Sequence, residues 1–191
     1  MIVLIDNYDS FSYNLYQMLG SIDPEITVIR NDAMTCKQIE EMHPDHIILS
    51  PGPGRPEDAG ICVEAVKYFE GKVPILGVCL GHQSICEAYG ATITYAKELM
   101  HGKQSIVTLD QTDRLFKGFK KETKVARYHS LAADQNTMPD CLKVTATAED
   151  GTIMAVKHKQ YETYGVQFHP ESVLTPEGKQ MLENFLGGKA Q

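Results

Sequence analysis

The sequence predicts an α/β fold with a central, mainly parallel β-sheet and an added antiparallel portion. In the first half of the chain, short apolar segments alternate with segments whose apolar residues have helical spacing, which is typical of parallel strands covered by helices on both faces. In the second half, strand-like segments follow one another almost without helices. The chain has 191 residues, of which 42% are hydrophobic and 23% are charged. This size and composition predict one domain over residues 1–191.

The first half contains four predicted strands, and each is an apolar run: IVLI (2–5), ITVI (26–29), HIILS (46–50) and VPILGV (73–78). Between the first two strands, Ser10 can cap a helix that Gly20 would end. The apolar face of this helix has four predicted members: Phe11, Leu15, Met18 and Leu19.

Further helices are expected between the later strands. Thr35 followed by Gln38 is a capping-box pattern that opens a short helix, and residues 61–69 form another. The segment PGPGRPEDAG (51–60) is too rich in proline and glycine to be anything but a loop. A helix is also expected directly after Cys79.

The second half is expected to add antiparallel strands, with AEDGT (148–152) as a hairpin turn. Six segments are predicted strands: ATITYA (91–96), SIVTL (105–109), KVARYHS (124–130), LKVTATA (142–148), TIMAVKH (152–158) and YGVQFH (164–169). A last helix is expected from Thr175, with Pro176 in its first turn. Its predicted apolar stripe consists of Met181, Leu182 and Phe185. The helix is expected to end at Gly187 and Gly188.

Charge and composition exclude several classes of partner. There are 18 basic and 25 acidic residues, a formal net charge of −7, and no basic cluster interleaved with aromatic residues, so no nucleic acid is expected to bind. The opening MIVLID lacks a basic leader and no apolar run approaches membrane-spanning length, so we expect a cytoplasmic protein without a membrane partner. The five cysteines have no CxxC spacing and are expected to be free thiols: Cys36, Cys62, Cys79, Cys86 and Cys141.

The stretch GVCLGHQS (77–84) gives the first indication of chemistry. Cys79 stands between two glycines, after a predicted buried strand and before a predicted helix, which is the G-x-S-x-G elbow with cysteine in place of serine. Gly77 and Gly81 would let neighbouring backbone approach the turn, and the helix N-terminus would favour the thiolate. A free cysteine is also often a small buried core residue, which is what we expect of the other four. From these residues alone, both interpretations of Cys79 stay open.

A candidate base lies in YGVQFHPES (164–172). His169 and Glu171 are two residues apart in a segment predicted to be extended, so both side chains can point to one side and the carboxylate can orient the imidazole. Taken alone, a histidine at a strand end beside a solvated glutamate is the simpler interpretation. Together with Cys79, the two residues form a Cys–His–Glu arrangement. The PGPG loop (51–54), after another predicted parallel strand, could supply N–H groups to an oxyanion hole.

Six motifs carry a family resemblance: DNYDSF (6–11), PGPG (51–54), GVCLGHQS (77–84), LMHGK (99–103), RYHSL (127–131) and GVQFHPE (165–171). With them the sequence resembles the class I (triad) glutamine amidotransferases over essentially its whole length. Within that family it is most similar to the glutaminase subunits of anthranilate synthase (component II) and of aminodeoxychorismate synthase. The resemblance implies a flavodoxin-like, three-layer fold.

The resemblance also implies a role for each motif residue. Cys79 would attack the side-chain amide of L-glutamine, and His169, oriented by Glu171, would transfer protons, which gives a γ-glutamyl thioester and ammonia. The N–H groups of Gly52 and Leu80 would stabilise the oxyanion. Four residues would line the glutamine site: Gly54, Gln83, His129 and Ser130. Without the resemblance, Gln83 is as well explained as a solvated helix residue and Ser130 as an ordinary strand residue.

The resemblance also implies a partner, a chorismate-binding synthase chain of the component I type, which would receive the ammonia. Its product would be anthranilate, for tryptophan, with aminodeoxychorismate, for folate, as the alternative, or one subunit would serve both. No metal or cofactor is expected in this chain, because His82 and Cys79 have no second ligand pair, and the resemblance places magnesium on the partner. The remaining alternatives are a stand-alone cysteine hydrolase or peptidase and a binding module without chemistry. The intact Cys–His–Glu set argues against the binding module.

Overall fold

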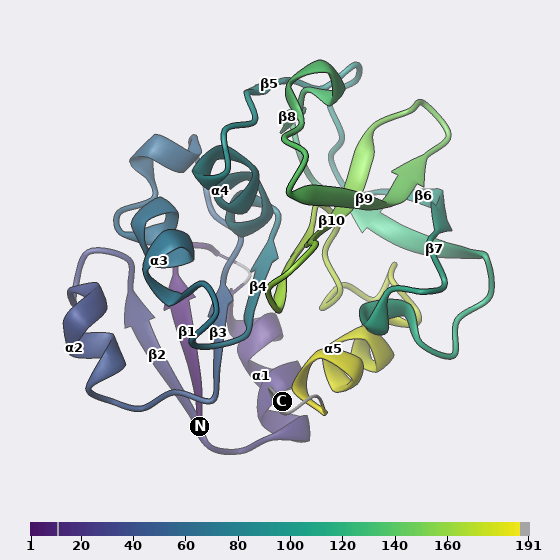
Figure 1. Ribbon diagram of the computed structural model, residues 1–191. Helices are drawn as coiled ribbons and strands as arrows, with labels where there is room; N and C mark the ends of the chain where they lie inside the picture. Colours follow the sequence, from purple (N-terminus) through teal and green to yellow (C-terminus); the bar gives the residue numbers. More distant parts are fainter. Residues whose placement is uncertain (11, 188–191) are drawn as a thin grey trace.

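The computed structural model describes residues 1–10 and 12–187, and within them a nine-stranded sheet runs in the order β2-β1-β3-β4-β11-β10-β9-β6-β7 (Figure 1). Five neighbouring strands are parallel: β2 (Ile26–Arg30), β1 (Ile2–Asp6), β3 (His46–Leu49), β4 (Ile75–Val78) and β11 (Thr163–Val166). The other four are antiparallel: β10 (Ile153–His158), β9 (Leu142–Ala148), β6 (Lys103–Leu109) and β7 (Glu122–Arg127). The parallel strands have the strand order of flavodoxin-like folds.

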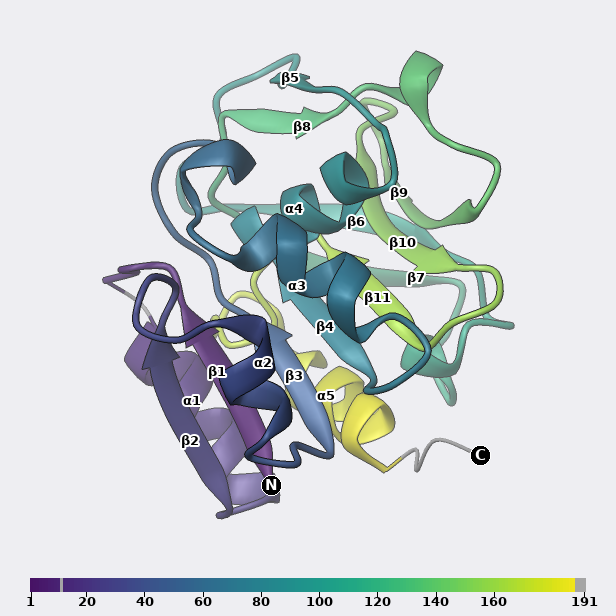
Figure 2. The ribbon, with the colours of Figure 1, turned by 60° about the vertical axis from the view of Figure 1, so that its left-hand side comes forward.

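Helices cover both faces of the parallel strands (Figure 2). One face carries α1 (Ser12–Ile22) and α5 (Gly178–Leu186), and the other carries α2 (Cys36–Glu40), α3 (Cys62–Phe69) and α4 (Leu80–Ala88). β1 shows why two layers form: Ile2 and Leu4 pack into the core under α1 and α5, whereas Val3 and Ile5 pack under α2 and α3, because successive strand side chains point to opposite faces. The predicted three-layer α/β fold with added antiparallel strands is confirmed.

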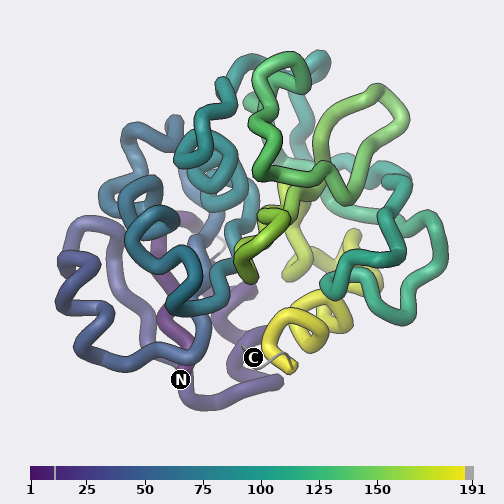
Figure 3. Tube along the Cα trace, viewed as in Figure 1, coloured from purple at the N-terminus to yellow at the C-terminus, as the bar shows by residue number. Residues whose placement is uncertain are grey.

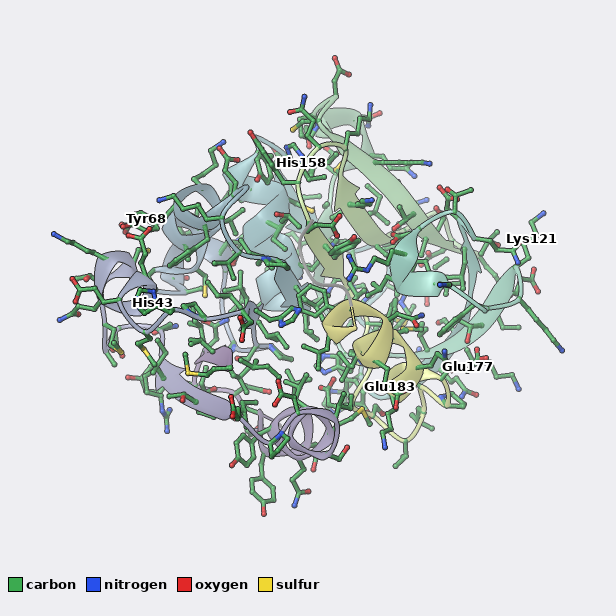
Figure 4. The ribbon with its side chains drawn as sticks, turned by 60° about the horizontal axis from the view of Figure 1, so that its bottom comes forward. His43, Tyr68, Lys121, His158, Glu177 and Glu183 are labelled. Carbon is green, nitrogen blue, oxygen red and sulfur yellow. The ribbon has the colours of Figure 1, made fainter. Side chains whose placement is uncertain are left out.

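The path of the chain returns late to the parallel portion. Figure 3 shows the first strands and helices on one side, the antiparallel strands on the other, and α5 coming back beside α1. Three short 3₁₀ turns lie in the connections: Pro56–Asp58, Arg114–Phe116 and Gln135–Thr137. Side chains fill the space between the ribbons, while charged groups such as Lys121 point outward from the rim (Figure 4). No helix in residues 1–10 and 12–187 has the length and apolarity needed to cross a membrane.

The first predicted helix is present, but its predicted end is wrong. α1 continues beyond Gly20 to Ile22, because a glycine inside a helix lowers its stability without breaking it and Ile22 packs against the core. Leu15 and Leu19 are fully buried, as their place on the apolar face predicts. Phe11, the other end of that face, lies outside the described residues.

The last predicted helix begins three residues late. Thr175 does not start α5, which begins at Gly178, because the Thr175 hydroxyl is engaged in tertiary hydrogen bonds. It donates to the carbonyl oxygen of His169 (2.7 Å) and accepts from the N–H of Ala126 (2.9 Å). The predicted apolar stripe is buried: Met181, Leu182 and Phe185. The predicted stop at Gly188 lies outside the described residues.

Two strands differ from expectation. The predicted YGVQFH strand, β11, ends at Val166 and pairs with β10 in the expected antiparallel sense, but it is parallel to β4 on its other side and therefore belongs to the parallel portion. A short strand that the sequence did not predict, β8 (Leu131–Ala133), forms a separate two-stranded sheet with β5 (Ile93–Tyr95). The capping box of Thr35 and Gln38 at the start of α2 is confirmed by both of its hydrogen bonds.

Candidate active site

The candidate site lies where three neighbouring parallel strands end at one edge of the sheet. β3 is followed by the PGPG loop, β4 by Cys79, and β11 by the segment that contains His169. Parallel strands place their carboxyl ends at the same edge, so segments that are distant in the sequence meet there. This arrangement brings together the three motifs that the sequence analysis singled out.

Cys79 occupies a strained turn immediately before α4. Its φ of 52° and ψ of −102° are uncommon for a residue other than glycine and cost about 1–3 kcal/mol. The turn fits because glycines flank it: a Cβ on Gly77 would lie 2.4 Å from the Gly81 carbonyl, and one on Gly81 would lie 2.3 Å from the carbonyl oxygen of Leu49. The predicted elbow geometry is therefore present, and Cys79 at its apex is 7% exposed.

His169 and Glu171 form a hydrogen-bonded pair. The Nδ1 atom of His169 lies 2.6 Å from Oε1 of Glu171, and both side chains are buried. The predicted extended conformation of this segment is wrong, because β11 has already ended and His169 lies in the loop that follows. Its N–H donates to the carbonyl of Ala126 (3.1 Å) and its carbonyl accepts from the Thr175 hydroxyl. Tertiary hydrogen bonds, rather than strand alternation, therefore bring imidazole and carboxylate together.

The electrostatics of His169 suit an acid beside a nucleophile. Burial by itself lowers the pKa of His169, but the interactions with Cys79 and Glu171 outweigh burial and raise the pKa to about 10. The imidazole is therefore protonated at neutral pH, with Nδ1–H donated to Glu171. The Nε2 atom makes no hydrogen bond within the described residues, so it is the atom that remains for Cys79 or for a leaving group.

The PGPG loop is fixed against the end of β1 by Asn7. The backbone N–H of Asn7 donates to Ser50 Oγ (2.8 Å) and its side-chain amide to the Ser50 carbonyl (2.7 Å). A Cβ on Gly52 would lie 2.5 Å from the Asn7 carbonyl oxygen, so only glycine fits there, and Gly54 has a left-handed φ of 82°. Neither the Gly52 nor the Leu80 N–H donates a hydrogen bond within the described part of the chain. Both groups are thus available for the predicted oxyanion hole.

The other predicted glutamine-site residues differ in burial. Gln83, in the first turns of α4, is buried and its amide nitrogen donates to the carbonyl of Leu131 (3.1 Å). His129 is also buried, with Nδ1 2.9 Å from the same carbonyl, and burial lowers its pKa to about 4, so its ring is neutral. Ser130 is exposed, so its side chain is not enclosed with the other two.

Two residues near the thiol were not predicted from the sequence to belong to the site. The side-chain nitrogen of Gln167, a fully buried residue, lies 3.5 Å from Cys79 Sγ. The carbonyl oxygen of Tyr128 lies 4.0 Å from the same sulfur, and its ring stands edge-on to the His169 imidazole with 5.1 Å between centroids. Both residues belong to motifs quoted above, but a glutamine or tyrosine at a strand end has no sequence signature of its own.

A cavity of about 520 Å³ opens beside His169 and Glu171. Tyr128 lines it, and Asn14 and Gln17 of α1 add polar groups. This volume is in the range of small-molecule sites. No group of three or more His, Cys, Asp or Glu side chains in the described ranges, 1–10 and 12–187, is arranged to hold a metal ion.

Comparison with known families agrees with this geometry. The family model described as glutamine amidotransferase class-I matches residues 3–188. The chain belongs to this family. A solved structure from Thermoplasma acidophilum, described as part of a GMP synthase, shares the amidotransferase's fold, with a TM-score of 0.87 at 24% identity over 97% of this chain and 92% of that one.

The amidotransferase is similar in sequence to several curated relatives. It is 50% identical over 186 residues to "Aminodeoxychorismate/anthranilate synthase component 2" of Bacillus subtilis, covering 97% of this chain and 95% of that one. It is 51% identical over 191 residues to "Anthranilate synthase component 2" of Pseudomonas putida, covering 97% and 96%. It is 52% identical over 187 residues to "Bifunctional protein TrpGD" of Thermotoga maritima, where it covers 97% of this chain but only 32% of the relative's length.

Proposed function

We propose that this amidotransferase hydrolyses L-glutamine through Cys79, His169 and Glu171 and delivers ammonia to a chorismate-binding synthase chain of the component I type. The observation that carries the catalytic part is the strained elbow at Cys79 beside the His169–Glu171 pair, which is joined by a 2.6 Å hydrogen bond. Relatives at about 50% identity that are named component 2 of anthranilate or aminodeoxychorismate synthase support the synthase partner.

The first half-reaction forms a thioester. Cys79 Sγ adds to the amide carbon of glutamine, and the N–H groups of Gly52 and Leu80 stabilise the oxyanion. The His169 imidazolium gives its Nε2 proton to the leaving nitrogen, the carbon–nitrogen bond breaks, and ammonia is released. Glu171 keeps Nδ1–H in place throughout, as the 2.6 Å hydrogen bond indicates.

The second half-reaction restores the enzyme. Neutral His169 takes a proton from water, the resulting hydroxide adds to the thioester carbon, and Cys79 leaves as thiolate, so glutamate is released and the imidazolium is regenerated. Gln83 and His129 lie in the buried wall beside the elbow and help to hold the substrate, with Gly54 and the backbone at Ser130 as further contacts. The proposal includes no metal or cofactor on this chain, magnesium on the partner, and a cytoplasmic location.

Anthranilate synthase is the favoured partner complex, in tryptophan synthesis. The relative from Pseudomonas putida carries that name alone, and the amidotransferase covers 96% of it. The relative from Bacillus subtilis carries both names, so aminodeoxychorismate synthesis, for folate, is the second candidate, and one subunit serving both is the third.

The catalytic part is tested with C79A. This variant is expected to lose glutamine-dependent product formation in the complex while leaving synthesis from added ammonium intact, because the partner's own site is untouched. Full glutamine-dependent activity in C79A would refute the assignment of the nucleophile. Partner-independent peptide hydrolysis without any response to glutamine would favour a stand-alone cysteine hydrolase.

The partner is tested by mixing the protein with each synthase type in turn. Glutamine and chorismate are supplied, and anthranilate and aminodeoxychorismate are quantified by chromatography. Anthranilate alone supports the favoured complex, aminodeoxychorismate alone the second candidate, and both products a shared subunit. Neither product, from synthase chains that are active with ammonium, would overturn the ammonia-donor role.

A further inference from the structure

Gln167 is placed directly beside the nucleophile by the register of the sheet. Val78 at the end of β4 pairs with Val166 at the end of β11, so Cys79 and Gln167 follow at neighbouring positions. The Gln167 side chain has no exposed surface, and its Nε2 atom lies 3.5 Å from Cys79 Sγ. The mechanism above gives this buried amide no role.

The orientation of the Gln167 amide is fixed by its neighbours. The Leu131 carbonyl can only accept, so the Gln83 side-chain nitrogen must face it, as it does at 3.1 Å. The same nitrogen lies 3.2 Å from Oε1 of Gln167. Turning the Gln167 amide over would place two NH₂ groups against each other. Its nitrogen therefore faces the sulfur.

The Leu131 carbonyl is itself held by a second donor. Arg127, a buried cation that can only donate, directs Nε–H to Nε2 of His129 (3.1 Å). His129 therefore carries its proton on Nδ1 and donates it to Leu131 (2.9 Å). Hydrogen bonds from His129 and from Gln83 thus converge on one carbonyl, and the network ends at the Gln167 amide.

We propose that Gln167 is a further catalytic residue of this site, whose side-chain N–H donates to Cys79 Sγ and stabilises the thiolate before attack. This inference rests on the proposed function. The two neighbours of the sulfur act in opposite senses: the Tyr128 carbonyl, 4.0 Å away, accepts from a thiol, whereas the nearer Gln167 donates to a thiolate. After the thioester forms, the sulfur has lost its charge and the Gln167 contact weakens. Its effect is therefore expected in thiolate formation.

The test is the pH dependence of Cys79 alkylation by iodoacetamide, read by mass spectrometry of the peptide that contains Cys79. In Q167M, which keeps the length of the side chain but has no donor, alkylation at pH 6 is expected to slow about tenfold, and this deficit is expected to shrink as the pH is raised. Q111L is the matched control, because Gln111 also donates a side-chain hydrogen bond, to the Phe119 carbonyl, outside the site. An identical pH profile for Q167M and the wild type would overturn the inference.

A second measurement uses the wild-type protein and does not depend on the folding of Q167M. The ¹⁵N-labelled side-chain amide of Gln167 is observed by NMR. Its proton resonance is expected to move downfield over the pH range in which Cys79 alkylation accelerates, and to stay fixed over that range in C79A. A Gln167 resonance that does not respond to pH in the wild type would also overturn the inference.

Failure of the proposed nucleophile and failure of the Gln167 role give different results. If wild-type Cys79 reacts no faster at pH 6 than Cys141, the partly exposed cysteine outside the site, the proposed nucleophile itself fails. If Cys79 is the faster residue but Q167M and the NMR titration show no coupling to it, only the role of Gln167 fails and the proposed function stands.

Discussion

The central parallel strands and the antiparallel strand β6 bury their side chains differently. Every residue of β1, β3 and β4 is buried, because helices cover both faces of these strands. In β6, by contrast, only Val107 and Leu109 are buried, as in an antiparallel strand with one face toward solvent. These three central strands are thus closed on both sides, whereas only Ile29 is buried in the edge strand β2. The loops of the central strands can act only at the edge where the strands end.

The two portions of the sheet contribute different groups to the site. The parallel portion supplies the side chains of the proposed triad and the amide beside the sulfur: Cys79, His169, Glu171 and Gln167. The end of β7 and the segment after it supply backbone carbonyls around them. The Ala126 carbonyl accepts from the backbone N–H of His169, the Tyr128 carbonyl lies 4.0 Å from Cys79 Sγ, and the Leu131 carbonyl accepts from Gln83. Changes to side chains on the first side should therefore alter chemistry. Changes on the second side, apart from the proposed substrate contacts at His129 and Ser130, should alter mainly stability.

The largest expected effect comes from removing the imidazole. H169A is expected to lower kcat for glutamine hydrolysis about 10,000-fold, because the leaving nitrogen loses its proton donor. Glutamate release is the measurement, with circular dichroism as the control for folding. A loss of less than tenfold in a folded variant would contradict the role of His169.

The second-largest effect is expected from a change in backbone packing at the elbow. G81A is expected to lower the free energy of unfolding by about 3 kcal/mol or more, because the new Cβ would lie 2.3 Å from the Leu49 carbonyl oxygen. G118A is the matched control in the antiparallel portion: its φ is 85°, but nothing lies within 4 Å, so a cost of about 1–2 kcal/mol is expected. Urea titration measures both. Equal losses would mean that the two portions do not differ in backbone packing.

Replacing the carboxylate is expected to change the pH profile. His169 loses its proton as pH rises through its raised pKa, so kcat/KM falls on the alkaline side. E171Q removes the charge of one of the two residues that raise this pKa, and the alkaline limb should move to lower pH by about 1–3 units. An alkaline limb that stays in place in E171Q would show that Glu171 does not act on His169.

The same pKa also links His169 to stability. Because its pKa is raised in the folded protein, His169 contributes stability that is fully present below about pH 6.5 and is lost as pH rises through about 10. In E171Q the loss still begins near pH 6.5, the unfolded value, but the contribution of His169 is smaller and its loss is complete at lower pH. Urea titrations at several pH values provide the check.

The smallest effect is expected in the antiparallel portion. Both terminal nitrogens of Arg127 lie 3.3 Å from Oδ2 of Asp150, and the guanidinium is 2% exposed while Asp150 is partly exposed. D150N is expected to lower the free energy of unfolding by about 1–2 kcal/mol, since a buried cation loses its charged partner while solvent screens part of the loss. The pKa of Asp150 is lowered in the fold, so the difference from wild type should shrink as pH falls below about 4. A large fall in kcat would contradict the division between the two portions.

The elements that could be predicted from the sequence are those that local interactions determine. The strands before Cys79 are apolar runs between clear turn signals, and the elbow follows from Gly77 and Gly81, so both were predictable. The parallel pairing of β11 was not, because its partner β4 lies almost 90 residues earlier and no local pattern encodes that contact. β8 was missed because a three-residue strand has no periodicity.

The site residues that could be predicted are those whose residue type and spacing already indicate their chemistry. A cysteine between glycines and a histidine two residues before a glutamate are visible in the sequence. The loop conformation at His169 was not, because it depends on hydrogen bonds from Thr175 and to Ala126 that only the folded chain brings together. Gln167 was missed because its role depends on which way its amide faces.

The position of β11 has a consequence for the order of assembly. It lies between β4 and β10, so within the described residues the two portions of the sheet are joined only through a strand at residues 163–166, and His169 lies three residues beyond its end. During synthesis the ribosome releases the nucleophile's half of the chain well before this strand and the base exist. A nascent amidotransferase is therefore chemically silent for most of its translation, and glutamine hydrolysis starts only when the strand that unites the sheet has been inserted.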